Sequence, residues 1–150
     1  MIDPDRFIKF LISKKISCFY GVPDSLLKPF CRELLDLPKD IHQITTNEAN
    51  AISSSIGNYL ATSKMACAYL QNSGLGNTIN PIVSLASKDV YSIPLLLLIG
   101  WRGELFPGDN QIKDEPQHIQ QGRITLEQLK VLDIPFYVLD ENCHDWESHT

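Results

Sequence analysis

Glu48 is a residue whose type and setting suit acid–base chemistry. It stands in Thr46-Asn47-Glu48-Ala49-Asn50-Ala51, directly after the short β-prone run 41–45 and in the first turn of an expected helix. A carboxylate at this point is favoured by the helix dipole, and that effect alone explains many such residues. The apolar neighbours Ala49, Ala51 and Ile52 also permit a second interpretation, a buried carboxylate at the sheet edge that exchanges a proton with a ligand nitrogen.

Three further polar or glycine-containing strings each follow a β-prone run. They are Gly21-Val22-Pro23-Asp24-Ser25 after 16–20, Gln71-Asn72-Ser73-Gly74-Leu75-Gly76-Asn77 after 65–70, and Gly100-Trp101-Arg102-Gly103-Glu104 after 93–99. In an open parallel sheet the carboxyl ends of the strands lie along one edge, where such folds bind ligands. The four strings therefore predict one composite site.

The string Gly74-Leu75-Gly76-Asn77 matches neither the dinucleotide fingerprint nor the P-loop. It could be an ordinary turn. Its glycines would also let the backbone approach a flat ligand closely, and the helix that follows offers free N–H groups at its N-terminus.

The cationic residues near the last string have two interpretations each. Arg102 beside Trp101 is either a stacked surface pair or, at the sheet edge, a bidentate clamp for an anion. The string Lys113-Asp114-Glu115-Pro116-Gln117-His118, with Arg123 nearby, is either a solvated loop or a lid that carries an acid–base histidine. Gly108-Asp109-Asn110 has no downstream carboxylate partner and predicts no metal site.

The elements that must position these residues alternate between helix and strand. Strands are predicted at 16–20, 41–45, 65–70, 93–99 and 136–139, and helices at 4–12, 26–35, 47–62, 78–86 and 125–132. The expected buried helical faces are Phe7, Ile8, Leu11 and Ile12 in the first helix and Ala49, Ile52, Ile56, Tyr59 and Leu60 in the third. The alternation predicts an α/β fold with a mostly parallel sheet and helices on both faces.

Two segments carry no predicted regular structure. Residues 100–123 are predicted to form a long loop, and loops of that length inside a domain are usually functional or mobile. Residues 140–150 are predicted to be a polar tail or linker after a domain of residues 1–139.

Composition excludes several classes of protein. A chain of 150 residues suits one domain, and its net charge of −5 argues against a nucleic-acid or anionic-membrane surface. The N-terminus does not resemble a signal peptide, and the apolar run 95–99 is too short to cross a membrane. Four scattered cysteines predict buried reduced thiols in a cytoplasmic protein.

Taken together, these strings resemble the phosphonopyruvate decarboxylases, which are thiamine-diphosphate-dependent decarboxylases. The resemblance rests on the five strings that contain Asp24, Glu48, Asn72, Arg102 and His118, and W-R-G-E and D-E-P-Q-H are its most specific parts. The chain is similar, more distantly, to sulfopyruvate decarboxylase, whose pyrimidine-side domain is a separate short subunit. The resemblance implies the pyrimidine-binding (PYR) domain of an oligomeric carboxy-lyase with active sites at interfaces.

The resemblance also implies roles for individual residues. Glu48 would hydrogen-bond the aminopyrimidine ring of thiamine diphosphate and so promote the proton transfer that activates the cofactor. The cofactor-binding residues would be Glu48, Asn72, Ser73, Gly74, Leu75, Gly76 and Asn77. The substrate-binding residues would be Pro23, Asp24, Ser25, Trp101, Arg102, Gln117 and His118. Ser25 and His118 join Glu48 as implied catalytic residues, His118 as a proton relay and Arg102 as the phosphonate ligand.

The chain departs from the family pattern in two ways. Residues 105–112 make a longer connection than the family leads us to expect. The family also holds Mg²⁺ and the diphosphate with a G-D-G motif on another domain, and this chain has no such motif in context. A partner domain or subunit is therefore implied, and with it the Mg²⁺ ligands.

The implied reaction is the decarboxylation of 3-phosphonopyruvate to phosphonoacetaldehyde and CO₂, in phosphonate biosynthesis. Two alternatives stay open. One is the alpha subunit of a sulfopyruvate decarboxylase, which makes sulfoacetaldehyde from 3-sulfopyruvate. The other is a non-catalytic, flavodoxin-like binding module.

Overall fold

Four parallel strands form the sheet, in the order β2-β1-β3-β4. They are β1 (Cys18–Gly21), β2 (His42–Ile44), β3 (Ala66–Gln71) and β4 (Leu96–Gly100). The structure is a computed structural model that describes residues 2–106, 108, 110–139 and 146–148. The crossovers between parallel strands are helical, as parallel pairing requires.

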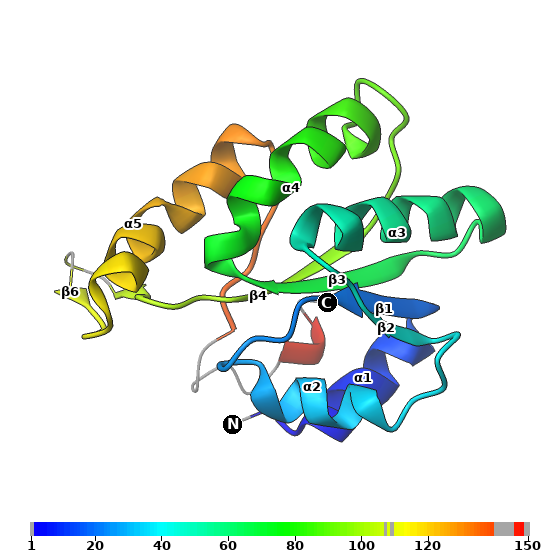
Figure 1. Ribbon diagram of the computed structural model, residues 1–150, viewed down its shortest axis with the longest axis horizontal. Helices are drawn as coiled ribbons and strands as arrows, with labels where there is room; N and C mark the ends of the chain where they lie inside the picture. The colour runs from blue at the N-terminus through cyan, green and yellow to red at the C-terminus, as the bar shows by residue number, and fades with distance from the viewer. Residues whose placement is uncertain (1, 107, 109, 140–145, 149–150) are drawn as a thin grey trace.

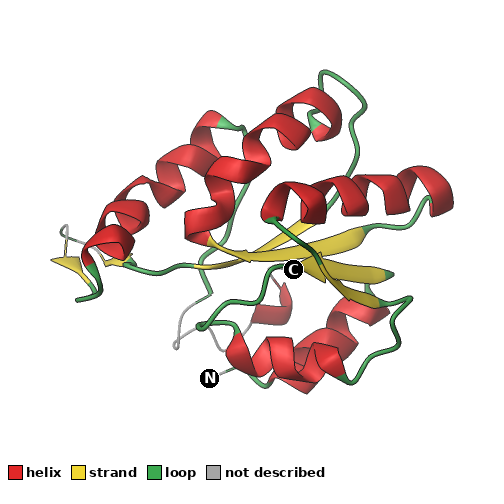
Figure 2. Cartoon of the chain, viewed as in Figure 1, coloured by secondary structure: helices red, strands yellow, loops and turns green. Residues whose placement is uncertain are grey.

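Helices cover both faces of the sheet (Figure 1). On one face lie α1 (Pro4–Ser13) and α2 (Lys28–Leu35), and on the other lie α3 (Glu48–Thr62), α4 (Leu75–Pro81) and α5 (Pro116–Val131). Figure 2 separates the two helical layers from the strands by colour. The predicted fold class, α/β with a mostly parallel sheet between helical layers, is confirmed.

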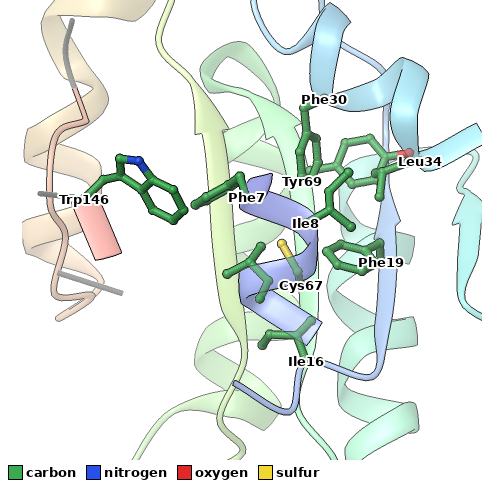
Figure 3. Close-up of a cluster of buried hydrophobic side chains, with 10 residues drawn as sticks. Phe7, Ile8, Ile16, Phe19, Phe30, Leu34, Cys67, Tyr69 and Trp146 are labelled. Atoms are coloured by element: carbon green, nitrogen blue, oxygen red, sulfur yellow. The ribbon is translucent and has the colours of Figure 1, made fainter. Parts of the chain in front are cut away.

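The central strand β3 supplies both layers of the core. Cys67 and Tyr69 point to the layer of α1 and α2, where they meet Phe19 and Phe30 (Figure 3). The residues that alternate with them, Ala68 and Leu70, pack against the opposite helices. Every residue from Ala66 to Leu70 is completely buried.

The first helix begins as predicted. The Asp3 side chain accepts a hydrogen bond of 2.8 Å from the Arg6 N–H, and Pro4 occupies the first helical position. Phe7, Ile8 and Leu11 are buried, but Ile12 is 44% exposed, so its predicted burial is wrong. Ile12 lies at the end of the helix, where the buried stripe has already turned away from the sheet.

In the third helix Ile52 and Ile56 are buried as predicted, whereas Leu60 is 68% exposed and that prediction is wrong. The helix extends beyond the strands at its C-terminal end (Figure 1), and Leu60 belongs to its last turn.

The helix after β3 starts earlier than residue 78. A 3₁₀ turn, η1 (Asn72–Gly74), leads directly into α4, so the Gly74–Asn77 string is helical and does not form an open loop. Pro81 lacks the N–H that would continue the α-helical ladder, and a π-helical segment, η2 (Ile82–Ala86), follows it.

The prediction of a loop at residues 100–123 is also wrong, in its second half. The helix α5 begins at Pro116 and not at 125, because proline is well suited to a first helical position. A small antiparallel pair, β5 (Leu105–Phe106) and β6 (Asn110–Gln111), occupies part of the remaining connection. Asp109 lies outside the described residues.

The predicted strand at 136–139 is not formed. Residues 133–139 have no strand structure, and Phe136, Tyr137 and Val138 are between 40% and 53% exposed. Pro135 offers no N–H for a ladder at its start. As a result β4 is an edge strand among the described residues, and its residues 96–99 are only half-buried.

The cysteines that the structure describes are free thiols. Cys18 and Cys67 are buried and Cys31 is half-buried, whereas Cys143 lies outside the described residues. Burial raises the pKa of the Cys67 thiol to about 12, so this thiol stays protonated. Within the described residues, no helix is both long enough and apolar enough to cross a bilayer.

Residues 146–148 form a short 3₁₀ segment, η3, that folds back onto the domain. The Trp146 ring is 5% exposed and lies edge-on to Phe7 (Figure 3), and it lies edge-on to Phe10 as well, each at 5.2 Å between ring centroids. Arg6 lies over the same indole and pairs with Glu147. The predicted tail thus contributes a core residue, while the domain end at 139 stays a prediction.

Changing Trp146→Ala should lower the free energy of unfolding of this chain by about 3 kcal/mol, because the change removes a buried ring and two edge-to-face contacts. Urea unfolding followed by far-UV circular dichroism measures the difference. The matched control is Tyr91→Ala, since Tyr91 is 67% exposed and should contribute less than about 0.5 kcal/mol. Equal stability of the two variants would contradict the packing of 146–148 onto α1.

Candidate active site

The carboxyl ends of all four strands lie along one edge of the sheet, as the parallel pairing requires. Along this edge, the segments after β2, β1, β3 and β4 follow one another in that order. The four strings singled out in the sequence are therefore neighbours in space. They form two groups of contacts, one around Glu48 and one around Arg102.

Glu48 begins α3, with Asn47 as the N-cap: the Asn47 side chain accepts from the Asn50 N–H at 2.9 Å. The Glu48 carboxylate reaches across to the start of α4. There Asn77 Nδ2 donates to Glu48 Oε2 at 2.7 Å. Glu48 is half-buried, so part of its side chain lies at the protein surface.

Gly74 provides the space that the Glu48 side chain fills. A Cβ built on Gly74 would lie 2.4 Å from the carboxyl carbon and from Oε1 of Glu48. No real Cβ approaches a carboxylate that closely, so any larger residue at 74 would displace it. By contrast, a Cβ on Gly76 would meet nothing within 4 Å.

Two other residues of the same string face the protein interior. Asn72 is 1% exposed, and its amide donates to Arg102 O at 3.0 Å and to Thr125 Oγ1 at 2.9 Å and accepts from the Arg102 N–H at 3.1 Å. The side chain of Leu75 lies in the core with Leu70 and Leu129. Side-chain contact of Asn72 or Leu75 with a ligand would therefore require these contacts to break. Ser73 is exposed and accepts from Gln71 Nε2.

Asp24 is the buried acid of the edge, at 6% exposure. Its Oδ2 accepts from the N–H groups of Leu26 and Leu27 at 3.1 and 3.3 Å. The same carboxylate lies against Gly100, where an added Cβ would be 2.1 Å from Oδ2. No described residue donates to the buried Oδ1. A buried oxygen without a donor is costly, which makes Oδ1 a candidate acceptor for a ligand.

Arg102 is not a free anion clamp. Its Nε donates to Asp114 Oδ2 at 2.7 Å and its Nη2 to Asp114 Oδ1 at 2.5 Å, so the carboxylate takes the bidentate edge of the guanidinium. The remaining nitrogen, Nη1, donates to Ser25 Oγ at 3.0 Å. His118 Nδ1 lies 2.9 Å from Asp114 Oδ1 and completes the group.

The charges of this group stabilise one another. The hydrogen bonds from Arg102 and His118 hold the pKa of the Asp114 carboxyl well below its usual range. The same bond to Asp114 raises the pKa of Arg102. Both side chains are largely buried, with 11% and 23% exposure, so this ion pair is better shielded than a surface pair.

The segment that carries Arg102 is fixed to α5 by separate contacts. Trp101 Nε1 donates to Gly122 O at 3.0 Å, and Gln111 Nε2 donates to the carbonyls of Gly103 and Ile119 at 2.7 and 2.8 Å. Gly122 is needed because an added Cβ would be 1.9 Å from Gly103 O. Gly103 itself has a φ of +65°, which favours glycine.

The structure thus brings together Glu48, Gly74 and Asn77 in one group, and Ser25, Arg102 and His118 in the other. Pro23 and Gln117 are exposed near the second group, and Trp101 is used to hold α5. Sequence reasoning missed Asp114 as the centre of the second group. Its signal was present: an acid one helical turn before His118, with Pro116 marking a helix start.

No group of three or more His, Cys, Asp or Glu side chains is arranged to hold a metal ion in the part of the chain that the structure describes. The expectation that Mg²⁺ is held by a partner domain stays a prediction.

Comparisons with known proteins identify relatives of this chain. The chain is 33% identical over 150 residues to a phosphonopyruvate decarboxylase of Streptomyces viridochromogenes, covering 100% of this chain and 35% of that protein. It is 37% identical over 130 residues to the alpha subunit of sulfopyruvate decarboxylase of Methanococcus maripaludis, covering 86% of this chain and 72% of the subunit. The chain therefore spans about a third of the first protein and most of the second.

A solved structure shares the fold. It is the X-ray structure of a protein of Mycobacterium smegmatis described as a thiamin diphosphate-dependent enzyme, with a TM-score of 0.54 and 24% identity. The superposition covers 71% of this chain and 19% of that one. Residues 4–128 match the family model of the thiamine pyrophosphate enzyme, N-terminal TPP binding domain. That match covers most of the chain, and the chain belongs to the thiamine pyrophosphate enzymes as an N-terminal TPP-binding domain.

Proposed function

We propose that this chain is the pyrimidine-binding half of a thiamine-diphosphate-dependent 2-oxo acid decarboxylase, and that the acid is 3-phosphonopyruvate. The observation that carries the proposal is the Glu48 carboxylate, held at the sheet edge by Asn77 and by contact with Gly74. This half would act with a diphosphate-binding domain or subunit that also holds Mg²⁺.

The residues of the first group fit the ring end of the cofactor. Glu48 offers its half-buried carboxylate as an acceptor beside the start of α4, where a Cβ on Gly76 would meet nothing within 4 Å. The bound cofactor supplies the carbon nucleophile and the electron sink that decarboxylation of a 2-oxo acid requires. Glu48 would accept a hydrogen bond from a ring nitrogen that carries a proton. Asn77 would keep the carboxylate in place for that contact.

The second group suits the substrate side. Arg102 Nη1 and Ser25 lie at the carboxyl ends of β4 and β1, where they can donate hydrogen bonds to an anion. The donor-free Oδ1 of the buried Asp24 could accept a hydrogen bond from a ligand group. The Arg102 charge is already balanced by Asp114, so the anionic end of the substrate would be bound mainly by a hydrogen bond from Nη1.

The identity to phosphonopyruvate decarboxylase over the whole chain supports the phosphonate substrate. The second candidate, 3-sulfopyruvate, has a specific observation in its favour. The relatives named sulfopyruvate decarboxylase subunit alpha are 37% and 38% identical to this chain, which covers 72% and 70% of their length. A non-catalytic binding module is disfavoured, because the chain belongs to an enzyme family and because Asn77 holds the Glu48 carboxylate by a hydrogen bond.

The assembled enzyme should decarboxylate 3-phosphonopyruvate with a kcat/KM at least about tenfold above that for 3-sulfopyruvate, a difference of about 1.4 kcal/mol in transition-state binding. Release of CO₂ from each acid, measured at matched ionic strength, gives the comparison. A preference for the sulfonate would replace the proposed substrate by the second candidate, and turnover of neither acid would refute the reaction class.

Replacing Glu48→Gln should lower kcat about a hundredfold or more, the range expected for loss of a positioned acid–base group, while cofactor still binds. Steady-state CO₂ release and calorimetric titration with thiamine diphosphate measure the two effects. Glu33→Gln, an exposed carboxylate of α2, is the control and should keep wild-type turnover. Full activity of Glu48→Gln would remove the proposed role.

Gly74→Ala tests the same carboxylate without changing it. The added methyl group would displace the Glu48 side chain, and kcat should fall about tenfold or more, since a misplaced catalytic group loses much of its effect. Gly57→Ala, in the helix α3 that carries Glu48, is the matched control. It meets open space, should keep full turnover and should raise stability by up to about 1 kcal/mol. Similar turnover of the two variants would contradict the contact between Gly74 and Glu48.

A further inference from the structure

Asp114 receives four hydrogen bonds, and three of them come from the side chains of Arg102 and His118. The fourth is the N–H of Glu115, at 2.8 Å. An ionised carboxylate can only accept, so His118 Nδ1 must carry the proton of their shared bond. The Asp114 side chain is 11% exposed. Apart from the Glu115 N–H, the described residues that bond its carboxylate all belong to the substrate-side group.

We propose that Asp114 is a positioning residue that orients both Arg102 and His118 for the substrate. The inference rests on the proposed function, because it gives these two residues a substrate to act on. It assigns the role to a residue that would itself touch neither substrate nor cofactor.

The effect on Arg102 follows from the shape of the guanidinium. Two bonds to one carboxylate fix the plane of the group, and the planar fork leaves Nη1 with one possible direction. In the structure that direction ends at Ser25 Oγ, 3.0 Å away at the end of β1. An anion at the sheet edge would therefore meet a fixed single donor of Arg102, with Ser25 beside it.

The effect on His118 follows from its tautomer. A carboxylate at Nδ1 keeps the proton on that nitrogen and orients the ring, so Nε2 is the nitrogen left to exchange a proton. Among the described residues, none is found to bond Nε2. Asp114 alone would thus set the direction of Arg102 Nη1 and determine which ring nitrogen of His118 carries the proton.

A purely structural role for Asp114 is the competing interpretation. The connection between β4 and α5 has its own supports, namely the bond from Trp101 to Gly122, the two bonds from Gln111 and the close contact of Gly103 with Gly122. These supports do not involve Asp114. Loss of its charge should therefore leave the segment folded and release only the two side chains.

The test uses Asp114→Asn in the complete enzyme, with whichever of the two acids the wild type turns over faster. The amide nitrogen of asparagine cannot accept a hydrogen bond, so some of the Arg102 and His118 donors lose their acceptor. As a result kcat/KM should fall about tenfold to a hundredfold. Glu115→Gln, the exposed neighbouring acid, should stay within about twofold of wild type. Asp114→Glu keeps the charge and should recover part of the loss.

The separate routes through the two residues can be resolved kinetically. When Arg102 is already changed to alanine, adding Asp114→Asn should leave KM within about twofold and lower only kcat, because the route through Arg102 no longer exists. If Asp114→Asn still raised KM in the Arg102→Ala background, the inference would be overturned. Wild-type kinetics of the single variant Asp114→Asn would overturn it as well.

A readout that needs no turnover is the imidazole of His118 in ¹⁵N NMR. The wild type should carry its proton at Nδ1, and Asp114→Asn should shift it toward Nε2, with a thermal unfolding midpoint close to wild type. The same tautomer in both proteins would overturn the inference. Turnover of neither acid by the wild type would instead refute the proposed function, and the NMR comparison would still decide the role of Asp114.

Discussion

Strand β3 is paired on both sides and buried on both faces, and the rest of the domain is arranged around that constraint. Its neighbours β1 and β4 run parallel to it, so their carboxyl ends must lie beside its own. Its side chains must fit two helical layers at once, which the small residues Ala66 and Ala68 permit. Gly21 belongs to the same constraint, since a Cβ there would be 2.2 Å from Tyr69 O.

The end of β3 also determines how the site is held. Asn72 leaves the strand and binds both backbone groups of Arg102, and Thr125 of α5 as well. One buried amide thus joins the end of β3, the end of β4 and the last helix. The satisfied bonds fix the segment that carries Arg102, because each of them would be costly to break in a dry environment.

The two groups at the edge differ in electrostatic character. Around Glu48 a single carboxylate meets neutral partners, Asn77 and the backbone at Gly74. Around Arg102 the charges already compensate one another, since Asp114 holds the bidentate edge of the guanidinium and binds His118. Under the proposed function, the first group would be the ring-binding side and the second the substrate side of one cleft. A partner domain would supply the other wall.

The sequence by itself determined the α/β class, the N-cap at Asp3, the order of the four sheet strands with the helices between them, and the meeting of four strings at one edge. These follow from local preferences and from the geometry of parallel strands, which need no knowledge of distant contacts. Only the tertiary structure decided that α4 begins at Leu75 and that residues 136–139 form no strand, whereas the start of α5 at Pro116 follows a local preference of proline. Glycines at 74 and 122 resemble loop residues in sequence, but each is required by a close approach from a residue far along the chain. The pairing of Arg102 with Asp114, and the burial of Trp146 against α1, depend on the same long-range packing and left no unambiguous local signal.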